Sequence, residues 1–84
     1  MSKTIQKFSL SLEREQKLLS PPNAEVILVT LDAEGQPALY AMVDPTLPRE
    51  EFVIHTIPTG DQVPPNTEHI GSLVFFGQTF HLFS

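Results

Sequence analysis

Short apolar runs separated by turn-forming residues make up most of this chain. Phe8, Leu10 and Leu12 alternate with serines, which predicts a strand over residues 4–12 with one buried face. Ile5 is out of step with this alternation, which favours a bulge or an irregular start. Residues 13–19 predict a short second strand or one helical turn. The two prolines that follow end any regular element because proline donates no ladder hydrogen bond.

The next two apolar segments predict a hairpin. Residues 25–31 are continuously apolar and β-branched, as in a strand covered on both faces. The sequence Asp-Ala-Glu-Gly at 32–35 predicts a type I turn with Gly35 in the left-handed conformation and a bulge, and residues 37–43 form the returning strand. Both strands are apolar on both faces, so we expect the hairpin in the centre of a sheet or at an interface. In such a hairpin the numbers of opposed residues add up to 68, which pairs Leu28 with Tyr40, Val29 with Leu39, and Val26 with Met42.

A further strand is predicted over residues 51–57, between a loop with prolines at 45 and 48 and a long irregular connection over 58–66. Together with the C-terminal segment this gives about five to six short strands. We therefore predict one small domain, residues 1–84, that is all-β or β-dominated and consists of an antiparallel sheet built from hairpins.

The C-terminal segment is the most distinctive part of the chain. Four of the six phenylalanines lie in the last ten residues, and no charged residue follows Ile70. Gly77-Gln78 predicts a type II′ turn, which opposes Phe75 to Phe80 and Leu73 to Leu82. These four residues are expected on the core side with Gly71, and Ser72 and Thr79 on the other side. A soluble protein must cover such a segment, so an interface is predicted at Val74, Phe76, His81 and Phe83.

Composition narrows the class of protein. A chain of 84 residues without cysteine buries a marginal core and has no disulfide or thiolate metal site, which favours a homo-oligomer. The net charge of −5 disfavours generic nucleic-acid binding because an acidic body repels phosphate. Four of the five cations lie in the first seventeen residues, where they are expected to balance the acidic body of this chain or of a neighbouring one. No signal peptide or membrane span is predicted, so we expect a cytoplasmic protein.

Few residues suggest chemistry. In the predicted hairpin His69 and His81 project to opposite faces, so they cannot share a metal ion unless a bulge intervenes. No nucleophile motif, catalytic site or cofactor is indicated. The best ligand candidate is the turn Thr59-Gly60-Asp61, because a glycine turn lets backbone N–H groups approach an anion. The residues expected near that turn are Tyr40, Thr56 and His69.

The order of several short motifs resembles one family of small uncharacterised proteins from tailed bacteriophages and prophages, classed as a domain of unknown function. The resemblance spans nearly the whole chain and implies a phage accessory protein without implying an activity. The family pattern would place histidine where Asp61 stands, so a role for that histidine does not carry over. The motifs are Thr4-Ile5-Gln6-Lys7-Phe8, Pro22-Asn23-Ala24, Gly35-x-Pro37, Ala41-x-Val43-Asp44-Pro45, Thr59-Gly60, His69-Ile70-Gly71-Ser72 and Phe80-His81-x-Phe83.

These observations lead to three hypotheses. The first is a non-catalytic, oligomeric binding protein that antagonises host defence by sequestering a small nucleotide signal or by blocking a host protein. The second is a protein–protein adaptor or virion-assembly component that uses the C-terminal hairpin as an added strand. The third is a small enzyme, which would need His55 or His69 with a carboxylate.

Overall fold

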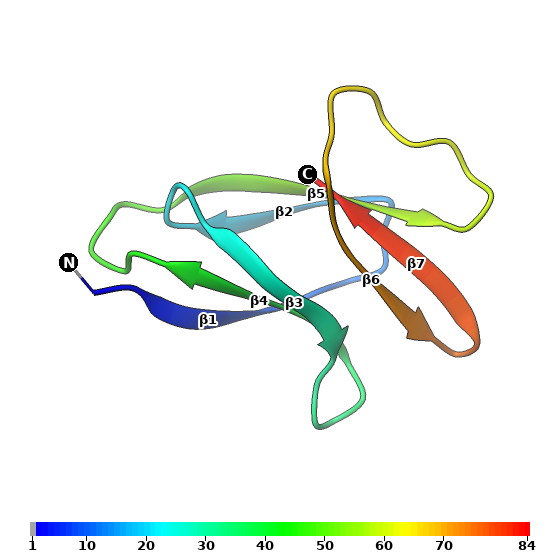
Figure 1. Ribbon diagram of the computed structural model, residues 1–84, viewed down its shortest axis with the longest axis horizontal. Helices are drawn as coiled ribbons and strands as arrows, with labels where there is room; N and C mark the ends of the chain where they lie inside the picture. Colours follow the sequence, from blue (N-terminus) through cyan, green and yellow to red (C-terminus); the bar gives the residue numbers. More distant parts are fainter. Residues whose placement is uncertain (1) are drawn as a thin grey trace.

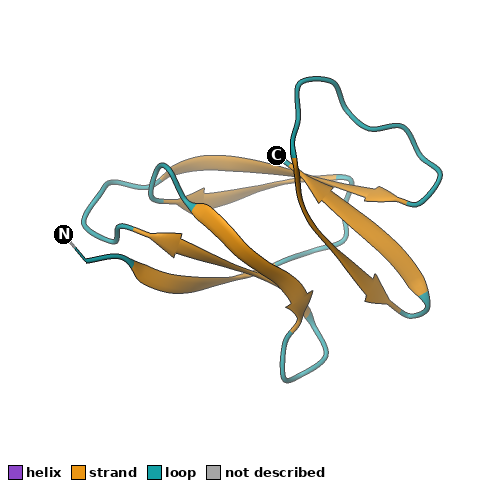
Figure 2. Cartoon of the chain, viewed as in Figure 1, coloured by secondary structure: helices purple, strands orange, loops and turns teal. Residues whose placement is uncertain are grey.

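The computed structural model describes residues 2–84, which form two antiparallel sheets and contain no helix. Sheet A has the order β1-β4-β3 and sheet B the order β2-β5-β7-β6. Figure 1 shows sheet A at the lower left and β6 and β7 at the right, and Figure 2 shows that all other described segments are loops. The all-β prediction is confirmed, with seven strands instead of five to six: β1 Thr4–Ser9, β2 Glu15–Ser20, β3 Glu25–Leu31, β4 Pro37–Val43, β5 Glu50–Pro58, β6 His69–Phe75 and β7 Gln78–Phe83.

The additional strand is β2. For residues 13–19 the sequence predicted either a short strand or one helical turn. That helical alternative is wrong, and the short-strand alternative is confirmed. The half-buried Gln16 and Leu18 alternate with exposed residues along β2, as the period of a strand requires. β2 pairs with β5 in sheet B, whereas β1 pairs with β4 in sheet A, so the chain changes sheets between two consecutive strands.

The β3–β4 hairpin forms at the predicted turn. The N–H of Gly35 donates to the carbonyl of Asp32 (2.9 Å), and Gly35 has a φ of 78°. Leu28 faces Tyr40 and Val29 faces Leu39, as predicted. The expected pairing of Val26 with Met42 is wrong, because a bulge at Ile27 shifts the register and places Val26 opposite Ala41. The strand β3 is an edge strand, and Leu28 on its outer face is 51% exposed, so the cover expected on both of its faces is not present among residues 2–84.

The C-terminal hairpin forms with a different turn from the predicted one. Its two turn residues are Phe76 and Gly77, with φ values of 49° and 76°, as a type I′ turn requires, so the type II′ turn at Gly77-Gln78 is wrong. Leu73 therefore faces Phe80, and Phe75 faces Gln78. The pairing moves by two residues, which keeps the strand residues after Ile70 on their predicted faces of the hairpin, whereas His69 changes face.

The core lies between the two sheets. Leu39 and Val43 of sheet A and Ile54 and Leu82 of sheet B are almost fully buried there. The sheets approach closely at Gly71 of β6, where an added Cβ would lie 2.4 Å from the side chain of Val29 on β3. Gly71 is thus on the core side, as predicted, and its missing side chain sets the spacing between β3 and β6.

Candidate functional site

The outer face of sheet B carries all three histidines. Register places His55, Phe83 and His69 in one row across β5, β7 and β6, and Ile57, His81 and Ser72 in the next row. The expectation that His69 and His81 project to opposite faces is wrong. A bulge at Ile70 shifts the register between His69 and Gly71 and turns His69 onto the same face as His81.

Four side chains on this face form a continuous chain of hydrogen bonds, which we call the polar chain: His69, Ser72, His81 and Thr59. His69 Nε2 lies 2.9 Å from Ser72 Oγ, and Ser72 Oγ lies 2.9 Å from His81 Nδ1. His81 Nε2 lies 2.9 Å from Thr59 Oγ1, whose hydroxyl also reaches the carbonyl oxygen of Thr79 at 3.4 Å.

One arrangement of protons uses all four contacts of the polar chain. Thr59 donates its hydroxyl proton to the Thr79 carbonyl, so it accepts from the N–H of His81 Nε2. His81 Nδ1 then carries a lone pair and accepts from Ser72, while Ser72 Oγ accepts from the N–H of His69 Nε2. In this arrangement one ring nitrogen of His81 donates and the other accepts, so the neighbours of His81 fix its tautomer.

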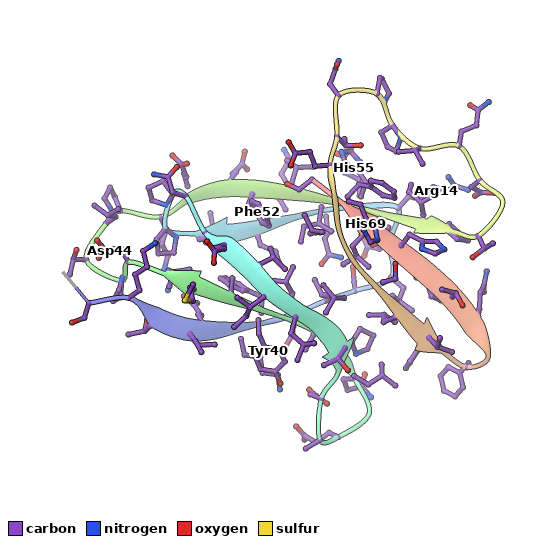
Figure 3. The ribbon with its side chains drawn as sticks, in the orientation of Figure 1. Arg14, Tyr40, Asp44, Phe52, His55 and His69 are labelled. Carbon is purple, nitrogen blue, oxygen red and sulfur yellow. The ribbon has the colours of Figure 1, made fainter. Side chains whose placement is uncertain are left out.

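A cleft of about 530 Å³ adjoins the polar chain on the same side of the molecule. Its sheet side contains His55 and the buried Ile57, and residues 61–65 of the long loop form the opposite wall. Arg14, which precedes β2, also lines the cleft and makes an ion pair with Asp61 of the loop. Figure 3 shows Arg14, His55 and His69 together at the upper right of the molecule.

The cleft contains charges of both signs. Glu15 Oε1 lies 3.8 Å from His55 Nδ1, and the Arg14 guanidinium is paired with a carboxylate. The remaining wall is apolar, with Val63, Pro64 and Pro65. The face as a whole therefore offers hydroxyl, imidazole and guanidinium groups beside an apolar wall, which is the usual composition of a small-molecule site. Within residues 2–84, no group of three or more histidine or carboxylate side chains is placed to hold a metal ion.

The structure brings together only some of the predicted ligand residues. Thr59 and His69 belong to the polar chain, and Gly60 and Asp61 follow directly in the adjoining loop. Tyr40 lies on the outer face of sheet A, at the bottom of Figure 3, because β4 belongs to the other sheet. Thr56 is 1% exposed and points into the core opposite Leu82. The expected proximity of Tyr40 to the turn is therefore wrong, and the Thr56 side chain, although it stands only three residues before the turn, points to the face of sheet B opposite the polar chain.

The four predicted interface residues lie in two different environments. Val74 is 57% exposed on the outer face of sheet B, and Phe76 is 92% exposed at the hairpin tip. His81 and Phe83 are half-buried among the polar chain and its neighbours, where the Phe83 ring packs edge-on against His69 at a centroid distance of 5.4 Å. Their role in association stays a prediction.

Sequence reasoning missed Ser72, Arg14 and Glu15 as site residues. Ser72 was placed on the correct face of the hairpin, but the bulge that brings His69 to it has no local signal in the sequence. Arg14 and Glu15 lie more than forty residues from the loop they approach, and the helical alternative for 13–19 hid the alternation of β2. Arg14 and Asp61 carry opposite charges, but nothing in their spacing along the sequence indicated that they are in contact.

None of the residues that the structure describes forms a helix long and apolar enough to cross a membrane. Comparison with curated proteins and with solved structures finds no match for the chain. A family model described as a domain of unknown function, DUF7352, matches residues 1–84. From the sequence we expected a family of unknown function, and this part of the expectation is confirmed. The chain belongs to the DUF7352 family over its whole length.

Proposed function

We propose that this protein is a non-catalytic binding protein whose outer sheet B face holds a small molecule with a phosphate or carboxylate group. The observation that carries the proposal is the polar chain, because side chains from three separate segments meet there on an accessible surface. Ser72 and His69 are both exposed, so a ligand oxygen can take the place of either as a hydrogen-bond partner.

The cleft beside the polar chain suggests the rest of the ligand. Ile57 and the prolines at 64 and 65 offer an apolar contact for a planar group, and Arg14 can exchange Asp61 for a ligand anion because its side chain is exposed. A nucleotide combines these features, with its phosphate at the polar chain and its base over the apolar wall. More specifically, we propose that the protein is a phage accessory protein that sequesters a nucleotide signal used in host defence.

Calorimetry with a panel of linear and cyclic nucleotides tests this proposal. We expect at least one nucleotide to bind with a micromolar dissociation constant. Ser72→Ala should weaken that binding at least about ten-fold, because one lost hydrogen bond to a charged group is worth about 1.5–3 kcal/mol. Ser9→Ala is the matched control, since Ser9 is an exposed strand serine on sheet A. Absence of binding across the panel, or equal binding by both variants, would refute the proposal.

A second candidate function, capture of a partner protein, is favoured by the hairpin tip. Phe76 adopts a left-handed backbone conformation that costs most side chains about 1–2 kcal/mol, and its ring is 92% exposed. Its ring lies edge-on to the neighbouring Phe75 ring, at a centroid distance of 4.4 Å. The adjacent strand β6 is a sheet edge without a charged residue, so it can accept an added strand.

The variant Phe76→Asn tests whether the Phe76 ring at the hairpin tip binds a partner protein. Asparagine suits the first position of a type I′ turn, so the variant should unfold at a higher temperature than the wild type. A partner recognised through the ring should at the same time be lost from affinity capture and from reconstitution with the purified partner. Retention of the partner by the variant with unchanged affinity would remove this second function.

A further inference from the structure

The outer face of sheet A is apolar where an exposed sheet face is normally polar. Ile5 is 64% exposed and Leu28 is 51% exposed, and Tyr40 and Met42 lie half-buried between them on β4. The opposite face of the same strands already packs into the core. Antiparallel sheets with one solvated face alternate apolar and polar residues, and β4 does not. This pattern is typical of a strand covered on both sides.

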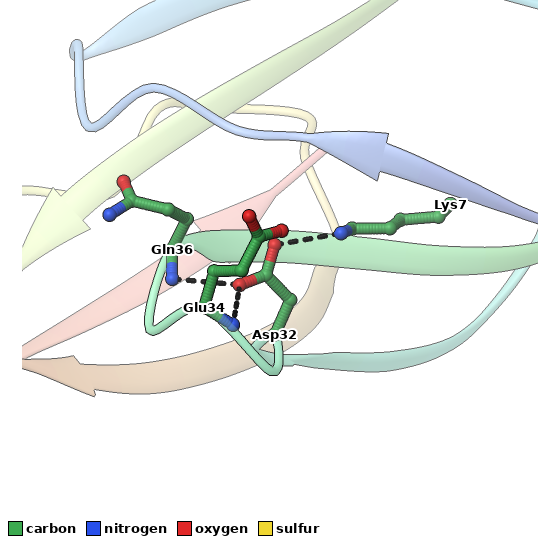
Figure 4. A network of polar contacts seen from close by, with 4 residues as sticks. All are labelled: Lys7, Asp32, Glu34 and Gln36. Atoms are coloured by element: carbon green, nitrogen blue, oxygen red, sulfur yellow. Dashed lines mark hydrogen bonds and ion pairs between the residues drawn. The ribbon is translucent and has the colours of Figure 1, made fainter.

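The charges at the rim of this face differ between its two edges. β1 carries Lys7, preceded on the same side by Lys3, and β3 carries Glu25 opposite Met42. Figure 4 shows that the Lys7 Nζ already contacts Asp32 Oδ2, at 2.7 Å. This hydrogen bond, with those from the backbone N–H groups of Gln36 and Glu34, lowers the pKa of Asp32. The face therefore has an apolar centre between a basic strand and an acidic strand.

We propose that a second copy of this chain covers this face, with the two sheets A packed face to face about a two-fold axis parallel to their strands. Such an axis reverses the strand order β1-β4-β3, so β1 of each copy lies over β3 of the other and β4 lies over β4. Glu25 of the second copy then comes level with Ile5, between Lys3 and Lys7. Packing of apolar β4 residues in the centre excludes water from both copies.

Charge selects this axis over the other two-fold axis in the plane between the sheets. An axis perpendicular to the strands would place β1 over β1 and bring lysines of both copies together. Like charges in direct opposition destabilise an interface, whereas the parallel axis pairs unlike charges.

The size of the face sets the expected affinity. Three strands spaced about 4.8 Å apart, each about six residues long, cover about 14 Å by 20 Å. The two faces together amount to about 560 Å², which is below the about 1,200 Å² of stable specific interfaces, so we expect a weak dimer with a dissociation constant of about 100 μM or more. The polar chain lies on the other sheet, so the dimer leaves the proposed ligand site accessible.

Sedimentation equilibrium at concentrations well above the expected dissociation constant tests the proposal. The wild type should be mainly dimeric there. Met42→Asp should raise the dissociation constant at least about a hundred-fold, because the axis places Met42 over Met42 of the second copy and the variant would bury two facing carboxylates. Val74→Asp tests the other interface, predicted on the C-terminal hairpin: Val74 is 57% exposed on the outer face of sheet B, so in the proposed dimer this variant should remain a dimer. A monomeric wild type, or a dimer that Val74→Asp dissociates and Met42→Asp does not, would overturn the proposal.

Charge reversal keeps the test decisive if Met42→Asp fails to fold. Glu25→Lys should weaken the dimer about ten-fold, and combining it with Lys3→Glu should restore most of the affinity because unlike charges face each other again. Circular dichroism checks that each variant is folded. If Glu25→Lys leaves the dissociation constant unchanged, or if Lys3→Glu weakens the double variant further, the proposed axis is wrong.

Discussion

At the scale of single residues, the most unusual atom in the core is the hydroxyl oxygen of Thr56. The side chain is 1% exposed, and its Oγ1 has no hydrogen-bond partner among residues 2–84. A buried hydroxyl without a partner costs about 1–3 kcal/mol relative to a hydrated one. Alternation along β5 places Phe52, Ile54 and Thr56 on one side of the strand, but the sequence gave no basis for deciding that this side faces the core.

Thr56→Val should stabilise the protein, because valine keeps the shape of threonine and removes the unpaired hydroxyl. We expect a gain of about 1 kcal/mol, which raises the melting temperature by about 4–8 °C in a domain of this size. Thr4→Val, at an exposed position on β1, is the control and should change stability by less than about 0.5 kcal/mol. A lower melting temperature for Thr56→Val would show that the hydroxyl has a partner in solution.

At the scale of elements, the turn of the β3–β4 hairpin was predictable, whereas the turn of the C-terminal hairpin and the bulges at Ile27 and Ile70 were not. The turn at Gly35 follows from a short motif whose residues each favour that conformation. The bulges at Ile27 and Ile70 lie near the N-terminal ends of β3 and β6, the two strands that approach each other across the core at Val29 and Gly71. Their position depends on packing between sheets, which no window of sequence contains.

The contact between β3 and β6 leads to a test at the scale of elements. Gly71→Ala should destabilise the protein by about 3 kcal/mol, because the new Cβ would lie 2.4 Å from Val29 Cγ2 and the two strands must separate. In a Val29→Gly background the same substitution should cost at least about 1 kcal/mol less, since the Cγ2 and Cβ atoms that lie 2.4 Å and 2.7 Å from the new Cβ are both gone. Urea unfolding of the four proteins measures this coupling, and strictly additive effects would contradict the close approach.

At the scale of the whole molecule, the sequence indicated strands and hairpins without indicating how they divide between two sheets. Two of the crossings from sheet to sheet contain prolines, at 21 and 22 between β2 and β3, and at 45 and 48 between β4 and β5. These prolines marked loops correctly, but a loop does not specify which sheet its chain enters next. For this reason Thr59 and His69 were correctly associated, whereas Tyr40 was assigned to the wrong side of the molecule.

The strand order also determines when this protein can fold during its synthesis. β1 must wait for β4, and β2 must wait for β5, before either finds its hydrogen-bonding partner. β7 lies between β5 and β6, so sheet B stays divided until its last strand has left the ribosome. Sheet A can assemble from the first half of the chain, but its apolar inner face then has no cover. A ribosome that pauses before β7 would therefore hold an exposed half-core within reach of chaperones and proteases.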